Sequence, residues 1–102
     1  MIQHIVFWKL AETAAGRDKE ANYRILKEKL EARNGVIPGL LELRVGRNLN
    51  GETAYDAALV SRFESLEALK AYDSHPAHME VRAFIKQVRL DRASLDFEME
   101  AP

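Results

Sequence analysis

The chain has 102 residues, of which 47% are hydrophobic and 30% charged, and this size and composition are typical of one globular domain spanning residues 1–102. Its 15 basic and 16 acidic residues are interspersed, and no basic patch is present, so we expect no nucleic-acid partner. There is no acidic tail either. Cysteine is absent, which excludes disulfides, thiolate nucleophiles and cysteine-bound metals and fits a reducing compartment. No segment is apolar over the length of a membrane span, and the N-terminus lacks the pattern of a signal peptide, so we expect a cytoplasmic protein with no membrane partner.

The first ten residues, MIQHIVFWKL, predict a strand because the segment is short and rich in β-branched and aromatic side chains. Successive side chains of a strand point to opposite faces of its sheet. One row contains Ile2, His4, Val6, Trp8 and Leu10, and the other contains Met1, Gln3, Ile5, Phe7 and Lys9. Both rows are apolar at their centres, so we expect both faces of this strand to be covered. The alternation leaves open which row faces the helices.

A loop over residues 11–17 is expected to precede a helix over residues 18–32, which is rich in charged helix formers. Three apolar residues recur at helical spacing and mark the core-facing side of this helix: Tyr23, Leu26 and Leu30. Asn34-Gly35 is expected to end the helix, because glycine readily adopts the left-handed conformation found just past helix ends.

Two further segments predict strands that are joined by a hairpin. The first, residues 40–48, alternates, and three of its side chains are expected on one face: Leu41, Leu43 and Val45. The second, residues 55–63, alternates in the same way and forms the return strand. Asn50-Gly51 between them is typical of a tight hairpin turn.

The last third of the chain predicts a helix that is broken once, followed by a strand. Ser65 is a suitable N-cap, because its hydroxyl can accept from the free backbone N–H groups of the first turn. His75-Pro76 interrupts the helix after Tyr72, because the residue before a proline is disfavoured in helical geometry, and Pro76 suits the first position of a new helix. Residues 94–99 alternate again and predict the final strand.

The predicted order of elements is strand, helix, strand, strand, broken helix, strand. This βαββαβ order predicts the α+β fold class and a ferredoxin-like domain, in which the helices cover one face of a four-stranded antiparallel sheet. The other face then exposes one apolar row of the first strand, which is unusual in a monomer. We therefore expect a homodimer in which two sheets pack face to face.

The segment YDSHPAH, residues 72–78, is the densest polar cluster of the sequence and lies at the expected helix break. Histidine titrates nearest to neutral pH, so His75 and His78 are candidates for general acid–base chemistry. A tyrosine nearby can donate a hydrogen bond to an enolate or carbonyl oxygen, and Tyr72 is in place for that role. The same residues also have a structural explanation, with Tyr72 packed in the core and His78 in a local hydrogen bond.

Other candidate residues have simpler explanations. His75, His78 and Asp73 offer too few ligands at a recognised spacing for a metal, and no phosphate-binding motif is present, so no metal and no cofactor is predicted. His4 lies in the middle of an apolar row, where it is either a buried, hydrogen-bonded imidazole or a direct participant in the chemistry. The arginine pairs are interpreted as solvated charges: Arg44 with Arg47, and Arg89 with Arg92.

Four segments of the sequence resemble the stress-responsive A/B barrel (Dabb) family. They are HIVFWKL at 4–10, IPGL at 37–40, FESLEAL at 63–69 and YDSHPAH at 72–78. The resemblance covers almost the whole chain in the expected order, and its opening HIV and later HPAH are the most specific parts. It implies the dimeric α+β barrel, in which two ferredoxin-like subunits pack sheet to sheet.

The resemblance also implies a site. A plant member of the family closes a polyketide chain by aldol chemistry, using a tyrosine and a histidine without a metal; on the matching segment these are Tyr72 and His78. The histidine of the first strand is His4. These residues would line a pocket for a small, partly apolar molecule between sheet and helices, with His78 as general base and Tyr72 stabilising the oxyanion. The row of His4 would then face the helices and leave Ile5 and Phe7 to the dimer.

Many members of the family are known only as stress-associated proteins, so the resemblance supports a second hypothesis as well. In this alternative the chain forms a structural or stress-protective dimer with no catalytic site. A solvent-connected cavity beside His78 would favour a ligand-binding site, and a filled core at that place would favour the structural dimer.

Overall fold

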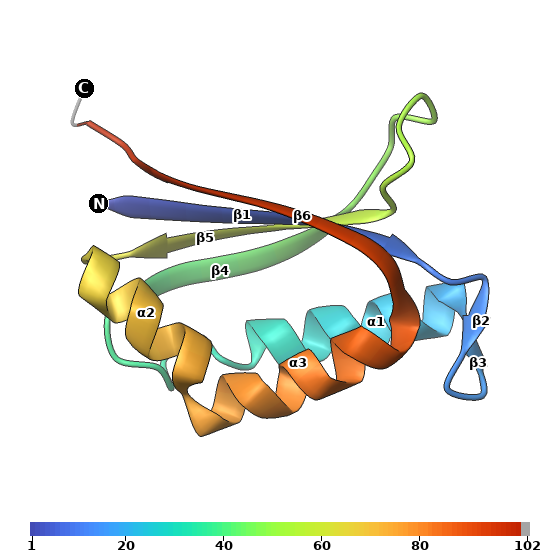
Figure 1. Ribbon diagram of the computed structural model, residues 1–102, viewed down its shortest axis with the longest axis horizontal. Coiled ribbons are helices and arrows are strands. Elements are labelled where there is room, and N and C mark those ends of the chain that lie inside the picture. Colours follow the sequence, from blue (N-terminus) through green and yellow to red (C-terminus); the bar gives the residue numbers. More distant parts are fainter. Residues whose placement is uncertain (101–102) are drawn as a thin grey trace.

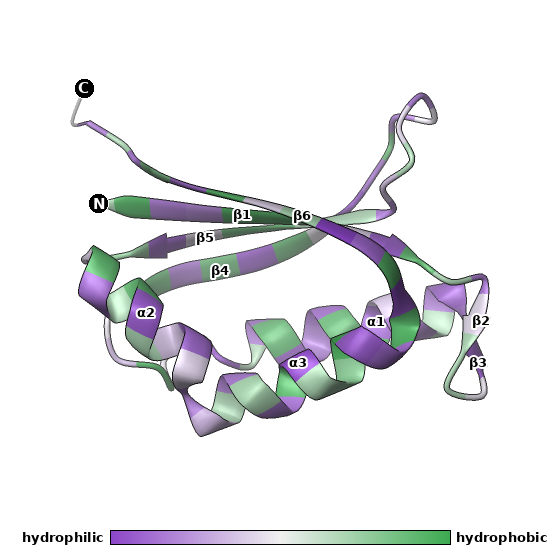
Figure 2. Cartoon of the chain, viewed as in Figure 1, coloured by the Kyte–Doolittle hydropathy of each residue, from purple (hydrophilic) through white to green (hydrophobic). Residues whose placement is uncertain are grey.

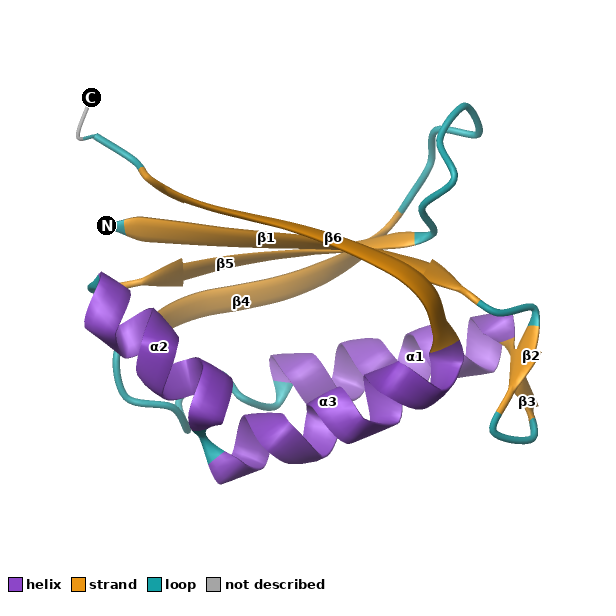
Figure 3. Ribbon diagram, in the orientation of Figure 1, coloured by secondary structure: helices purple, strands orange, loops and turns teal. Residues whose placement is uncertain are grey.

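The computed structural model describes residues 1–100 and consists of two layers, a four-stranded sheet and three helices lying against one of its faces (Figure 1). The separation of strands from helices is clearest in the colouring of Figure 3. The elements in chain order are β1 (Ile2–Leu10), β2 (Thr13–Ala14), β3 (Arg17–Asp18), α1 (Lys19–Glu31), β4 (Leu40–Arg47), β5 (Ala57–Phe63), α2 (Leu66–Ser74), α3 (Pro76–Val88) and β6 (Arg89–Glu98). No helix within residues 1–100 has the length and apolar character needed to cross a membrane. A single domain over residues 1–102 stays a prediction, because its last two residues lie outside the described range.

The four strands of the sheet are arranged in the order β4-β5-β1-β6, and every neighbouring pair is antiparallel. One helix follows β1 and the broken helix follows β5, so the arrangement is the ferredoxin-like βαββαβ fold. The predicted fold class is therefore confirmed. One addition is the short ribbon formed by β2 and β3, which occupies part of the segment that was expected to be a plain loop.

The two rows of β1 have different surroundings. Val6, Trp8 and Leu10 are buried under the helices, whereas Phe7 on the other row is 43% exposed. The row that includes His4 therefore faces the helices, and the question left open by the alternation is resolved. Hydrophobic and hydrophilic residues alternate along β4 as well, as expected for a sheet with one face covered by helices (Figure 2).

Helix α1 is held at both ends by side-chain hydrogen bonds to the backbone. Asp18 caps its start, because a carboxylate oxygen accepts from the backbone N–H of Ala21 at 2.8 Å. The helix ends at Glu31, earlier than predicted, and Asn34 instead bridges to β4 through two 2.9 Å hydrogen bonds with the backbone of Leu43. The predicted apolar face is buried: Tyr23, Leu26 and Leu30.

The break between α2 and α3 falls where proline predicts it. The Ser65 hydroxyl accepts from the backbone N–H of Ala68 and caps α2, as expected. His75 ends α2, and its Nδ1 accepts from the backbone N–H of Ala77 at 3.1 Å, so the same residue caps the start of α3 at Pro76. The chain changes direction here, and residues on either side of the break reach the same region below the sheet (Figure 1).

The predicted buried face of β4 is wrong at one position. A β-bulge between Leu40 and Glu42 sets two residues against one on the neighbouring strand and shifts the alternation. Leu40 is consequently buried together with Leu43 and Val45, while Leu41 is exposed on the opposite face. Alternation alone cannot show a bulge, because the inserted residue has no distinctive side chain here.

The connection between β4 and β5 is longer than the tight turn that was predicted. β5 begins at Ala57, and residues 48–56 form an open loop. The backbone N–H of Asp56 donates to the carbonyl of Trp8 at 2.8 Å, and the Asp56 carboxylate accepts from the N–H of Leu10 at 2.7 Å. The carbonyl of Asp56 also accepts from the backbone N–H of Asn48 at 2.9 Å, so the chain at Asp56 is attached both to the end of β1 and to the residue that follows β4.

The final strand is also longer than predicted. β6 begins at Arg89 directly after α3 and pairs with β1 as far as Leu10, whereas the alternation predicted only residues 94–99. The first residues of β6 are mostly charged, so local preference did not mark them as a strand. Their pairing with β1 outweighs that preference.

Candidate functional site

A cavity of about 320 Å³ lies between the inner face of the sheet and helices α2 and α3. Its size is at the lower end of the range typical of small-molecule sites. The three residues singled out from the sequence, His4, Tyr72 and His78, all line it. Residues from β1, α2 and α3 therefore meet at one place although 74 positions of the sequence separate His4 from His78.

His4 is held by a carboxylate that sequence reasoning did not single out. The imidazole is buried, and its Nδ1 is hydrogen-bonded to Oδ1 of Asp96, which lies directly opposite His4 on β6. An ionised carboxylate only accepts hydrogen bonds, so Nδ1 is assigned the hydrogen and donates the hydrogen bond to Asp96. In the neutral form of this ring the lone pair lies on the other nitrogen, Nε2.

Tyr72 lies at the end of α2 and is almost completely buried against other rings. Its ring centroid is 3.9 Å from that of His78 and 5.0 Å from that of Phe63. Burial raises the pKa of the Tyr72 hydroxyl above its usual value, and the nearby carboxylate of Asp73 adds to this effect. The phenol is therefore neutral at physiological pH and keeps its proton for donation.

His78 lies in the first turn of α3 and is buried as well. Its Nδ1 has no hydrogen-bond partner within residues 1–100, so the local hydrogen bond of the structural explanation is not made at this atom. Burial and, to a smaller extent, the positive charge of Arg82 lower the pKa of His78 to about 4. The imidazole is neutral at physiological pH and has one nitrogen that can accept a proton.

His75, the other histidine of the segment, has a structural task. Its ring caps α3 by accepting from Ala77, and it does not line the cavity. No group of three or more His, Cys, Asp or Glu side chains in the described part of the chain is arranged to hold a metal ion. The absence of a metal or cofactor from the protein's chemistry stays a prediction.

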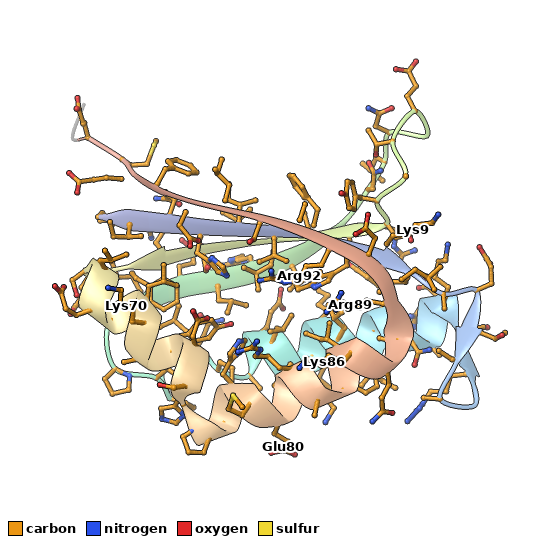
Figure 4. All side chains as sticks on the ribbon, in the orientation of Figure 1. Lys9, Lys70, Glu80, Lys86, Arg89 and Arg92 are labelled. Atoms are coloured by element: carbon orange, nitrogen blue, oxygen red, sulfur yellow. The ribbon has the colours of Figure 1, made fainter. Side chains whose placement is uncertain are left out.

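Positive side chains surround the cavity on two sides. Arg82 and Lys86 come from α3, and Arg89 and Arg92 come from the start of β6. Figure 4 labels Lys86, Arg89 and Arg92. Because β6 begins five residues earlier than predicted, Arg89 and Arg92 also line the cavity. Arg92 is exposed to solvent, as its interpretation as a solvated charge expects, and Arg89 is half-buried. The other arginine pair, Arg44 and Arg47, does lie exposed in surface ion pairs, as expected.

Residues 2–99 match the family model described as Stress Responsive A/B Barrel Domain, which confirms the resemblance seen in the sequence motifs. An uncharacterized protein of Streptomyces coelicolor is 37% identical over 81 residues, which are 76% of this chain and 79% of that protein. A solved structure from Bacteroides fragilis, described as a dimeric protein of unknown function with a ferredoxin-like fold, is 30% identical with a TM-score of 0.86 and covers 96% of this chain and 95% of its own. A dimeric ferredoxin-like protein of unknown function from Thermobifida fusca is 26% identical with a TM-score of 0.80 and covers 96% and 90%.

Proposed function

Since the chain belongs to the stress responsive A/B barrel domain family, we propose that it is a cytoplasmic homodimer that binds or transforms a small, partly apolar molecule in the cavity between sheet and helices. The observation that carries this proposal is the convergence of His4, Tyr72 and His78 on one cavity, together with the Nδ1 of His78, which has no hydrogen-bond partner within residues 1–100. Apolar side chains from the sheet and helices line the cavity next to its charged residues, which suits a ligand that is only partly apolar.

If the ligand is transformed, the three residues support acid–base chemistry without a metal. The neutral imidazole of His78 accepts a proton from a carbon next to a carbonyl, and the Tyr72 hydroxyl donates a hydrogen bond to the oxygen on which negative charge develops. His78 then returns the proton to the product. His4, oriented by Asp96, offers a second acceptor nitrogen on the opposite wall of the cavity.

A base with a pKa near 4 is weak at neutral pH, and the surrounding positive charges are part of the reason. Negative charge that develops on a bound substrate beside His78 opposes the effect of Arg82, so the pKa of His78 rises as the reaction proceeds. This change favours proton transfer when the oxyanion forms and not before.

The second copy of the chain is proposed to cover the outer face of the sheet. Ile5 lies between Val60 and Leu95 in the register of the sheet, and the latter two are 47% and 63% exposed. Phe7, in the next row, packs against Tyr55 at 5.7 Å between ring centroids. The helices lie on the other face, and the solved relatives are dimers, so a sheet-to-sheet homodimer is the cover that these observations favour.

The competing function is a structural or stress-protective dimer with no catalytic site. One observation favours it: the ring of Tyr72 packs against both His78 and Phe63, so the burial of this tyrosine and histidine has an explanation from packing alone. The cavity and the unpartnered Nδ1 of His78 favour ligand binding instead, because a purely structural core would fill the space and pair that nitrogen.

The test is a ligand and activity screen of carbonyl-containing small molecules on the wild type, on Tyr72→Phe and on His78→Ala. We expect both variants to weaken any binding or turnover signal, since each removes a polar atom that reaches the cavity. Tyr23→Phe is the matched control, because it removes the same hydroxyl from a tyrosine that is buried elsewhere, beneath the guanidinium of Arg47. A signal that survives both site variants undiminished would show that the site is wrongly placed.

A further inference from the structure

We infer that the ligand of this cavity is an organic anion, whose carboxylate or phosphate group is held by Arg82, Lys86, Arg89 and Arg92 while its apolar body lies against the buried wall. The inference rests on the proposed function, because it presupposes that the cavity binds a ligand, and it adds the chemical class of that ligand.

The charge at the cavity differs from that of the chain as a whole. Four cationic side chains line it against two carboxylates, Asp73 and Asp96, whereas the whole chain has a formal charge of −1. One of the two carboxylates, Asp96, is already hydrogen-bonded to His4. Positive charge is therefore concentrated here without matching negative charge, and such a site attracts anions.

None of the four cations makes a salt bridge with another residue of the described chain. Basic side chains elsewhere do so repeatedly, for example Arg47 with Glu20 and Arg62 with Glu42. The guanidinium of Arg92 reaches only the Ser94 hydroxyl at 3.3 Å. Arg82 reaches only a backbone carbonyl at 3.4 Å. Their strongest hydrogen-bonding capacity, toward a charged acceptor, is thus unused.

The fold explains why these cations gather at one place. Arg82 and Lys86 are four residues apart and share one face of α3. β6 follows α3 without a loop and returns along β1, where Arg92 lies opposite Trp8, a residue of the inner row. Figure 4 shows Lys86, Arg89 and Arg92 near one another between β6 and α3. A carboxylate or phosphate between these two elements can be bound by planar guanidinium groups through paired hydrogen bonds.

The inner end of the cavity is formed by Trp8 and by apolar side chains. Trp8 lines the cavity and is 3% exposed, and its indole Nε1 has no hydrogen-bond partner within residues 1–100. Around it the wall is apolar, formed by Val6, Leu30, Leu59 and Ile85. An anion with an aromatic or branched aliphatic body fits this combination better than inorganic phosphate.

The experiment compares three probes. Benzoate and the neutral benzamide differ in charge but hardly in shape, and phenyl phosphate carries a phosphate in place of the carboxylate. Trp8 is the only tryptophan of the chain, so its single indole N–H signal in a nitrogen–proton NMR spectrum reports binding at this cavity. The expected result is that benzoate or phenyl phosphate shifts this signal at concentrations at least about tenfold lower than benzamide does. Which of the two anions binds more tightly decides between a carboxylate and a phosphate ligand.

Variants of the dimeric protein test whether the arginines of β6 hold the anionic group of the ligand. Arg89→Gln and Arg92→Gln are each expected to weaken benzoate or phenyl phosphate binding by about tenfold, and to leave benzamide binding unchanged. Arg24→Gln is the matched control, because it removes the same charge from the exposed side of α1, away from the cavity. An anion also opposes the positive charges around His78, so its binding is expected to raise the pKa of that imidazole in the same titration.

Two outcomes overturn the inference and are distinguishable. Equal binding of benzoate, benzamide and phenyl phosphate, with Tyr72→Phe still weakening all three, rejects an anionic ligand and leaves the proposed cavity function standing. No shift of the Trp8 signal with any probe at millimolar concentration contradicts the proposed function together with the inference.

Discussion

The two faces of the sheet are built from the same strands but carry different kinds of side chain. The inner face, which the helices cover, buries polar groups such as His4 and Ser61 among its apolar residues. The outer face has no helix over it and exposes large apolar side chains, among them Phe7, Val60 and Leu95 (Figure 1). The covered face thus contains the core but buries polar groups within it, whereas the uncovered face leaves apolar side chains in contact with solvent, and neither feature is favoured by the stability of an isolated subunit.

This difference indicates separate tasks for the two faces. A buried polar atom costs free energy unless it is hydrogen-bonded, so the unpartnered Nδ1 of His78 and Nε1 of Trp8 are expensive to retain without a function. The apolar outer face incurs no such cost and gains stability as soon as another apolar surface covers it. Binding of a ligand suits the inner face, and association with a second copy suits the outer face.

The largest expected effect is on the inner face. Phe63 is fully buried beside Tyr72, so Phe63→Ala should lower the free energy of unfolding by about 3–5 kcal/mol, since it removes contacts and leaves a void. Chemical denaturation followed by circular dichroism measures this change. Val60→Ala, on the other face of β5, is the control and should cost much less, with a cost that depends on protein concentration. Similar losses for both variants would contradict the distinction between the faces.

On the outer face, a charge should separate the two copies. Val60→Asp places a carboxylate at the centre of the proposed interface, and we expect the dissociation constant of the dimer to rise at least about a hundredfold. Light scattering after size-exclusion chromatography measures the mass of the particle. Leu66→Asp is a matched control, because Leu66 on α2 is as exposed as Val60, at 47%, but lies away from the sheet face. A wild-type chain that is monomeric at micromolar concentration would refute the interface altogether.

Titration of His78 should make stability depend on pH in a defined window. Its pKa is about 4 in the fold and near 6.5 in the unfolded chain, so the unfolded state takes up a proton first as the pH falls. The free energy of unfolding should therefore decrease below pH 6.5, by about 2 kcal/mol at pH 5, and level off below pH 4. Urea denaturation across this range, compared with His78→Gln, isolates the contribution. The same pH slope in both proteins would show that His78 is not buried as described.

The smallest effect is expected at the pair of His4 and Asp96. Asp96→Asn removes the negative charge that holds the proton on Nδ1 of His4, so part of the population should shift to the other tautomer. Nitrogen chemical shifts of the imidazole report the tautomer. The loss of stability should be only about 1 kcal/mol, because the Asp96 side chain is half exposed. Glu98→Gln, which changes an exposed carboxylate at the end of the same strand, should leave the imidazole signals unaltered.

The fold could be predicted from the sequence to a large extent, because its signals are local. The alternation of β1, the helical spacing in α1 and the proline break before Pro76 each depend on neighbouring residues alone. The bulge in β4 and the early start of β6 were missed, since both arise from pairing with another strand. Where pairing and local preference disagree, pairing decides the boundary.

The candidate site was only partly predictable for the same reason. Tyr72 and His78 are six positions apart on either side of a helix break, so their proximity follows from local structure. His4 was assigned through the family resemblance, and Asp96 was not found at all, because only the register of β6 against β1 places it beside His4. The place of Arg92 at the cavity was missed for the same reason, although its exposure to solvent was expected.

The sequence by itself determined the order of the elements, the two apolar rows of β1 and the concentration of polar residues at the helix break. These features depend only on neighbouring residues and on the periods of strand and helix. Only the tertiary structure decided which row of β1 faces the helices and which charges meet at the cavity. These depend on how β6 returns along β1, and a one-residue change of that register would turn Arg92 and Asp96 to the outer face.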